Sequence, residues 1–166
     1  MTENVKMTKP FGICGTALEW FTSYLKDRCQ ALKVGSMLSE QHELLYGVPQ
    51  RSVLGPLLFS MYTTPLRKVI EMHPGIKFHF YADDTQLFVQ LCPKDASSML
   101  QKLNSCLVDV QKWMSSSKLK LNPEKTEFIV FGSENQRSKL NHLFPANIVG
   151  NLLHPAQRVK NLGCMV

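Results

Sequence analysis

The chain has 166 residues, of which 44% are hydrophobic and 19% are charged. This length suits one domain that buries about two-thirds of its unfolded surface, and the composition excludes a disordered tail. The net charge of +6 favours an anionic partner, nucleic acid being the commonest, although surplus lysine on a small domain is often only a solvated face.

The cysteines and histidines argue against a disulfide framework and a zinc site. The five cysteines are scattered without C-x-x-C spacing, and the five histidines lack the i, i+4 pairing of a metal-binding helix. No apolar run reaches the ~18 residues of a membrane span, and the first residues lack an apolar signal core. We therefore expect an intracellular protein, nuclear or cytoplasmic, that does not enter a membrane.

The first predicted element is a helix over 16–27. Thr16 and Glu19 have the spacing of a capping box, and Leu18, Phe21 and Leu25 follow at helical intervals. Alternating residues predict a strand over 30–34, a turn at 35–36 and a second short strand over 43–46.

A loop beginning at Gly47 leads into a predicted apolar helix. Its packing face comprises Leu57, Leu58, Met61 and Tyr62, and it ends near 73–75. Pro65 either kinks this helix or starts a new turn. Apolar runs at 78–80 and 86–91 then predict a hairpin.

The clearest amphipathic helix follows, with Asp95 as its predicted cap. Its apolar positions are Leu100, Leu103, Leu107, Val110 and Met114, and the serines at 115–117 end it. The run 127–131 predicts a buried strand, 133–141 a loop, and short apolar strands are expected near 148–149, 152–153 and 159–166.

The tetrad Tyr81-Ala82-Asp83-Asp84 occupies the tip of the predicted hairpin. Two adjacent carboxylates repel each other, and a divalent metal ion most readily offsets that repulsion. The tetrad therefore predicts half of a metal site. A plain turn is the alternative, because Asp is a common turn residue.

Several blocks in order extend this pattern over most of the chain, and together they resemble the palm of a reverse transcriptase from a non-LTR (LINE-type) retrotransposon. The blocks are 12–25, 28–30, the loop 47–56, the tetrad, 119–127 and 161–163. The resemblance implies an α+β palm with a split βαβ-like antiparallel sheet and packed helices. It covers 12–166 as one partial palm domain, leaves 1–11 unmatched, and leaves the first palm strand unaccounted for.

In this family two metal ions about 4 Å apart are bridged by acidic side chains. The resemblance implies that Asp83 is the main Mg²⁺ ligand and Asp84 its helper. It also implies that the small side chain of Ala82 lets the nucleic-acid backbone come close. Tyr81 either supports the turn, touches the primer end, or packs against Phe78 or Phe88.

The remaining family blocks suggest template and nucleotide contacts. Gln50 and Gly55 belong to the loop that faces template or nucleotide, and Arg51 stands where the family usually has glycine, so it either obstructs the nucleotide or meets phosphate. Asn122 and Lys125 match the region near the leaving pyrophosphate, although a lone lysine is usually just solvated. Leu162 and Gly163 resemble the start of the primer-grip hairpin.

The family places another essential aspartate on a strand before the block that begins at Gly12, where this chain has only Glu3. We therefore expect weak Mg²⁺ binding and little activity from this chain alone, as a truncated palm without fingers or thumb. In the parent family the partners are an RNA template, a DNA primer and dNTP, and here a partner chain can cover the exposed sheet.

The alternative is a non-catalytic RNA- or protein-binding module that uses Lys118, Lys120 and Lys125. A reading frame without a selected role also stays open.

Overall fold

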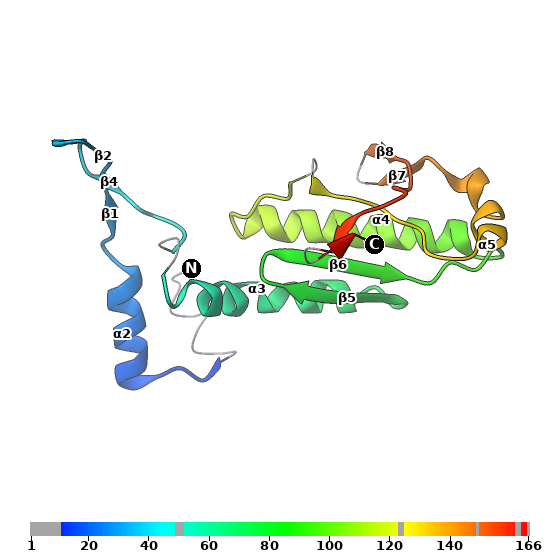
Figure 1. Cartoon of the computed structure of the whole chain (residues 1–166). Coiled ribbons are helices and arrows are strands. Elements are labelled where there is room, and N and C mark those ends of the chain that lie inside the picture. The colour runs from blue at the N-terminus through cyan, green and yellow to red at the C-terminus, as the bar shows by residue number, and fades with distance from the viewer. Residues whose placement is uncertain (1–10, 49–51, 123–124, 149, 162–163, 166) are drawn as a thin grey trace. The chain divides into compact units, whose positions relative to one another are not determined.

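The computed structural model describes residues 11–48, 52–122, 125–148, 150–161 and 164–165 (Figure 1). The chain divides into two compact units, unit 1 (Met1–Thr64) and unit 2 (Pro65–Val166). Each unit is described by itself.

In unit 1 the expected helix is α2 (Gly15–Leu25). The predicted capping box is wrong: the N-cap is Cys14, whose side chain makes no capping hydrogen bond, and Thr16 lies inside the first turn. The helix ends at Leu25, and Asp27, two residues further on, adopts a left-handed φ of 52° that turns the chain. The predicted end at 27 is therefore two residues too late.

Short ladders follow in unit 1. β1 (Cys29–Gln30) pairs with β4 (His42–Glu43), and between them β2 (Lys33–Val34) pairs with β3 (Met37–Leu38). The turn at 35–36 is confirmed, and Gly35 has the positive φ of 62° that favours glycine. The single strand expected over 30–34 is interrupted at 31–32, and the one expected over 43–46 keeps only Glu43.

The predicted apolar helix is α3 (Gly55–Glu71), which begins in unit 1 and ends in unit 2. Pro65 lies within it and the helix continues through it. Leu57 is 51% exposed, so its predicted place on the packing face is wrong. The buried positions are Leu58, Leu66 and Ile70.

In unit 2 the predicted hairpin is confirmed as β5 (Ile76–Tyr81) and β6 (Asp84–Val89), paired antiparallel. Alternate side chains face opposite sides. The inner side chains, Ile76, Phe78, Phe80, Leu87 and Val89, belong to or pack against the core.

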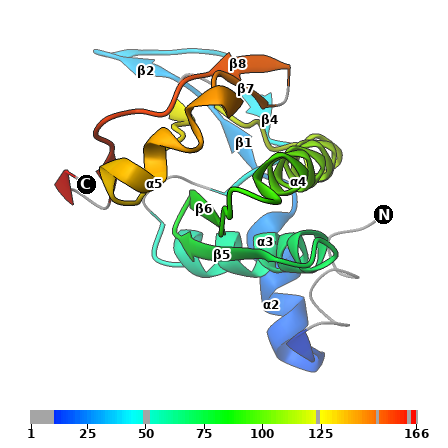
Figure 2. The same ribbon diagram turned by 90° about the vertical axis from the view of Figure 1, so that its right-hand side faces the viewer.

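The predicted amphipathic helix is α4 (Ala96–Ser116). Asp95 holds the N-cap position, but its side chain makes no capping hydrogen bond. The core of unit 2 joins α4 to the end of α3 and to the inner hairpin face through Leu66, Ile70, Ile76, Leu103, Cys106 and Val110. Figure 2, which views α4 nearly end-on, shows this arrangement of two helices and a hairpin.

The segment after α4 differs most from expectation. Residues 127–131 form no strand. Phe128 instead packs against the core, and its carbonyl accepts a hydrogen bond from the Ala156 amide at 2.7 Å. The predicted loop 133–141 contains α5 (Glu134–Ser138), whose capping box joins Ser133 and Gln136, and a 3-10 turn, η2 (Asn141–Leu143), follows.

The final strands are short hairpin pairs. β7 (Ala146–Ile148) pairs with β8 (Asn151–Leu153), so strands lie near the expected positions 148–149 and 152–153, although residue 149 lies outside the described residues. β9 (Lys160–Asn161) pairs with β10 (Cys164–Met165) within the expected range 159–166. The mixed helix and antiparallel-strand class is therefore confirmed. Within the described residues every ladder has two strands, and no larger sheet joins them.

Candidate functional site

The tetrad lies at the tip of the β5–β6 hairpin. Tyr81 and Asp84 form the last strand pair, and Ala82 and Asp83 make the two-residue turn between them. Ala82 has a positive φ of 51°. That backbone angle disfavours an L-residue by roughly 1–2 kcal/mol, and the rest of the hairpin holds it there. All four residues are exposed.

Tyr81 points to the outer face of the hairpin and is 57% exposed. In the described structure no ring contact joins it to Phe78 or Phe88, and Phe78 lies against Phe80 instead, with ring centroids 5.0 Å apart. Packing against Phe78 or Phe88 therefore does not explain Tyr81, and its ring remains accessible beside Asp84.

Asp83 and Asp84 offer two exposed carboxylates on adjacent residues. Among the described residues no group of three His, Cys, Asp or Glu side chains is placed to hold a metal ion. The described part of the chain therefore does not fit a complete two-metal centre.

Lys125 is exposed and follows a turn anchored by Asn122. The Asn122 carbonyl accepts hydrogen bonds from the Lys125 amide at 3.2 Å and from Thr126 Oγ1 at 2.9 Å. These two bonds link residues 125 and 126 to Asn122, and the Lys125 side chain is exposed.

Of the other predicted contact residues, only Gly55 lies within the described part of the chain. Gly55 begins α3 in unit 1, where its amide donates to the Ser52 carbonyl at 3.1 Å. Gln50, Arg51, Leu162 and Gly163 lie outside the described residues.

A polar contact in unit 2 has no counterpart in the sequence-based expectations. His73 Nε2 lies 3.1 Å from Asp109 Oδ2, and Lys112 Nζ lies 3.4 Å from Asp109 Oδ1. His73 follows α3 and Asp109 lies on α4, so no local pattern indicates their contact. It ties the α3–β5 connection to α4.

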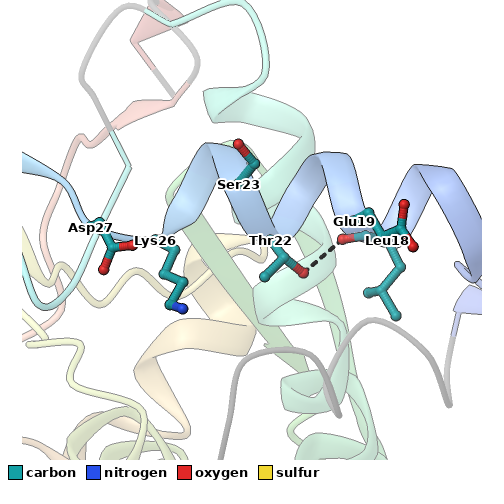
Figure 3. A pocket seen from close by; sticks show the side chains of 6 residues that line it. All are labelled: Leu18, Glu19, Thr22, Ser23, Lys26 and Asp27. Carbon is teal, nitrogen blue, oxygen red and sulfur yellow. Dashed lines mark hydrogen bonds between the residues drawn. The ribbon is translucent and has the colours of Figure 1, made fainter.

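A shallow depression runs along α2 in unit 1 (Figure 3). It is lined by Leu18, Glu19, Thr22, Ser23, Lys26 and Asp27, and Thr22 Oγ1 donates to the Leu18 carbonyl at 2.7 Å. All six residues come from one helix and its end, and none belongs to the predicted site.

Within the described residues, no helix combines the length and apolar character needed to cross a membrane.

Comparisons with known proteins identify the family. The family model described as reverse transcriptase (RNA-dependent DNA polymerase) matches residues 1–166. A probable RNA-directed DNA polymerase from transposon BS of Drosophila melanogaster is 37% identical over 109 residues, which are 63% of this chain and 12% of that protein.

Two further Drosophila melanogaster proteins are similar. The RNA-directed DNA polymerase from mobile element jockey is 29% identical over 67% of this chain, and a probable RNA-directed DNA polymerase from transposon X-element is 28% identical over 66%. The chain spans about an eighth of the length of these relatives, since the matches cover 12% of each. No solved structure matches this chain. The family match and these relatives confirm the resemblance drawn from the motifs: the chain belongs to the reverse transcriptase family, as a fragment of the LINE type.

Proposed function

We propose that this chain is the part of a reverse-transcriptase palm that presents the metal-binding hairpin, and that Asp83 and Asp84 are its metal ligands. The observation that carries the proposal is the exposed two-residue turn, which places adjacent carboxylates at the tip of a hairpin anchored in the core of unit 2. Divalent Mg²⁺, the metal that the family uses, would neutralise charge there when bound.

The chain's own residues would act by holding the two carboxylates in position. The inner hairpin residues hold the tip through apolar contacts with α3 and α4, so Asp83 and Asp84 need no local partner to stay in place. The small side chain of Ala82 leaves the space beside both carboxylates open for a nucleic-acid backbone. A complete site requires at least one further carboxylate from outside the described residues.

Manganese titration followed by NMR tests the ligand assignment, because paramagnetic Mn²⁺ broadens the signals of nearby amides. We expect selective broadening at Ala82, Asp83 and Asp84 at low Mn²⁺. Asp83→Asn should weaken the apparent affinity by at least about tenfold, because one of two ligating charges is lost.

Asp95→Asn is the matched control, because Asp95 is also exposed and its carboxylate makes no capping hydrogen bond. The amide signals of that variant should broaden with Mn²⁺ in the same way as those of the native chain. Broadening that is uniform over the surface, or unchanged in Asp83→Asn, would remove Asp83 and Asp84 from the metal site.

A second candidate is nucleic-acid binding without chemistry. The exposed lysines after α4 favour it, and they can serve either function.

A further inference from the structure

Arg28 links the end of α2 to the start of the loop 47–56. Its Nε donates to the Leu25 carbonyl at 3.0 Å, and its Nη2 donates to the Gly47 carbonyl, 19 residues further along the chain, at 2.6 Å. Both contacts lie within unit 1. One side chain thus joins two segments of unit 1 that are distant in sequence.

The contact with Leu25 explains why a cation suits this position. Leu25 is the last residue of α2, and the last carbonyls of a helix lack an intrahelical donor. A positive charge is also favourable at the negative end of the helix dipole. The turn at Asp27, whose φ is 52°, lets the Arg28 side chain reach back to this carbonyl.

The contact with Gly47 is the second of two bonds between Arg28 and the segment 44–47. The Arg28 carbonyl accepts a hydrogen bond from the Leu44 amide at 2.7 Å, beside the β1–β4 ladder. Gly47 itself has a positive φ of 83°, a backbone angle that favours glycine. Arg28 therefore holds the ladder end with its backbone and the start of the loop with its guanidinium.

The far end of the loop is also anchored in unit 1. The Gly55 amide donates to the Ser52 carbonyl at 3.1 Å, where α3 begins. The structure describes 47–48 and 52–56 of this loop. Because α3 fixes one end, the Arg28 contact with Gly47 is what fixes the other.

We propose that Arg28 is a positioning residue that fixes the start of the loop 47–56 against α2 and the β1–β4 ladder. Gln50 and Gly55, which are expected to contact template or nucleotide, belong to this loop, so Arg28 acts on substrate only through the loop. The inference goes beyond the proposed function, which concerns the hairpin of unit 2.

The geometry requires arginine and not just a positive charge. A guanidinium presents its donors in a rigid planar fork, so Nε and Nη2 can hold two carbonyls at once. A lysine ammonium is a compact point charge on a flexible stem and does not reproduce this pair of bonds. In the described part of the chain no ion pair engages Arg28.

NMR of the full chain labelled with ¹⁵N and ¹³C tests the proposal by comparing the native chain with Arg28→Gln. In the native chain we expect amide order parameters at Gly47 and Val48 of about 0.85, as in rigid backbone, and in Arg28→Gln values below about 0.6. The Gly47 carbonyl carbon signal should move upfield, because its donor is lost. The Leu44 amide bonds to the Arg28 backbone, so its order parameter should keep the native value.

Arg28→Lys separates positioning of the loop from simple capping of α2. Lysine keeps the charge near the helix end, so exchange of the Lys26 amide, which bonds to the Thr22 carbonyl at 3.0 Å, should stay native. Gly47 and Val48 should nevertheless become as mobile as in Arg28→Gln. Native order parameters and a native Gly47 carbonyl signal in both variants would overturn the proposal, since Arg28 would then only cap the helix.

Lys26→Gln is the matched control. It removes the same charge at the same end of α2, and in the described structure the exposed Lys26 side chain makes no hydrogen bond or ion pair. We expect native signals at Gly47 and Val48. If Lys26→Gln moved these signals as far as Arg28→Gln does, the effect would come from charge and the proposal would fail. If Arg28→Gln also lost the β1–β4 ladder, Arg28→Lys would decide by the same two signals.

Discussion

Cys106 lies at the centre of the unit 2 core, where its side chain has no exposed surface. Burial raises the pKa of its thiol from 9.0 to about 11, and the nearby Asp109 carboxylate adds to the rise. The thiolate is the reactive form of cysteine, so Cys106 is inert at neutral pH and serves as a small apolar core residue.

The raised pKa of Cys106 predicts a loss of stability at alkaline pH. Its contribution is fully present below pH 9.0 and is lost as pH rises toward about 11, because the unfolded chain releases the proton first. We expect the free energy of unfolding, measured with denaturant, to fall more steeply over this window in the native chain than in Cys106→Ala.

Cys92→Ala is the matched control, because Cys92 is exposed and its loss should keep the native pH profile. If Cys106→Ala and Cys92→Ala give the same alkaline slope, the buried thiol has no such role.

At the scale of the element, α3 is a continuous helix with a proline inside it. Pro65 has no amide hydrogen, so the Met61 carbonyl lacks its usual helical donor. Hydroxyl groups bond to carbonyls of the same turn: Thr63 Oγ1 donates to Phe59 at 2.9 Å, and Thr64 Oγ1 donates to Ser60 at 2.8 Å. The boundary between the two units falls at this proline.

Pro65→Ala should therefore strengthen α3. Restoring the amide donor and removing the ring clash should stabilise the chain by about 1–3 kcal/mol, less any gain in unfolded-state entropy. Thermal unfolding measures the effect, and Pro74→Ala, outside the helix, is the control. An unchanged or lower melting temperature in Pro65→Ala would show that the proline geometry is itself required.

Elements with a clear hydrophobic period were predictable from the sequence. Two apolar runs flank the tetrad, and α4 repeats its apolar residues at helical spacing, so the sequence locates both elements to within a few residues. The tip tetrad follows from that hairpin, which is why the geometry of Asp83 and Asp84 was foreseen.

The errors have local causes. Residues 127–131 have strand composition, yet Phe128 is stabilised by core packing and a single backbone bond without a partner strand. The polar helix α5 has no periodic pattern of apolar residues, and the only feature of the sequence that indicates a helix there is the Ser133–Gln136 capping box. The contact between His73 and Asp109 depends on tertiary packing, which the spacing of residues along the sequence does not predict.

At the scale of the whole molecule, the two units differ in how many apolar side chains they bury. Unit 2 contains the apolar core, whereas Leu58 is the only buried residue in the described part of unit 1. Helix α2 buries none of its residues, although Trp20 stacks on Tyr24 with ring centroids 5.5 Å apart. The ladders of unit 1 expose both faces.

Hydrogen exchange should separate the units. Amides of Leu103, Cys106 and Val110 on α4 should exchange at least about 100-fold more slowly than those of β1 and β4, because local opening follows buried contact. Mass spectrometry of exchanged peptides gives the comparison. Equal protection in both groups would show that unit 1 gains stability from contacts beyond those described.

The strand ladders have a consequence for how the chain forms. Apart from β1 and β4, each described strand pairs with the next or the preceding strand in sequence, and the β1–β4 pair encloses only the β2–β3 hairpin. Closing short loops costs little entropy, so these ladders need no distant segment to form. During synthesis, each hairpin can assemble as soon as its second strand has left the ribosome, before the following residues are translated.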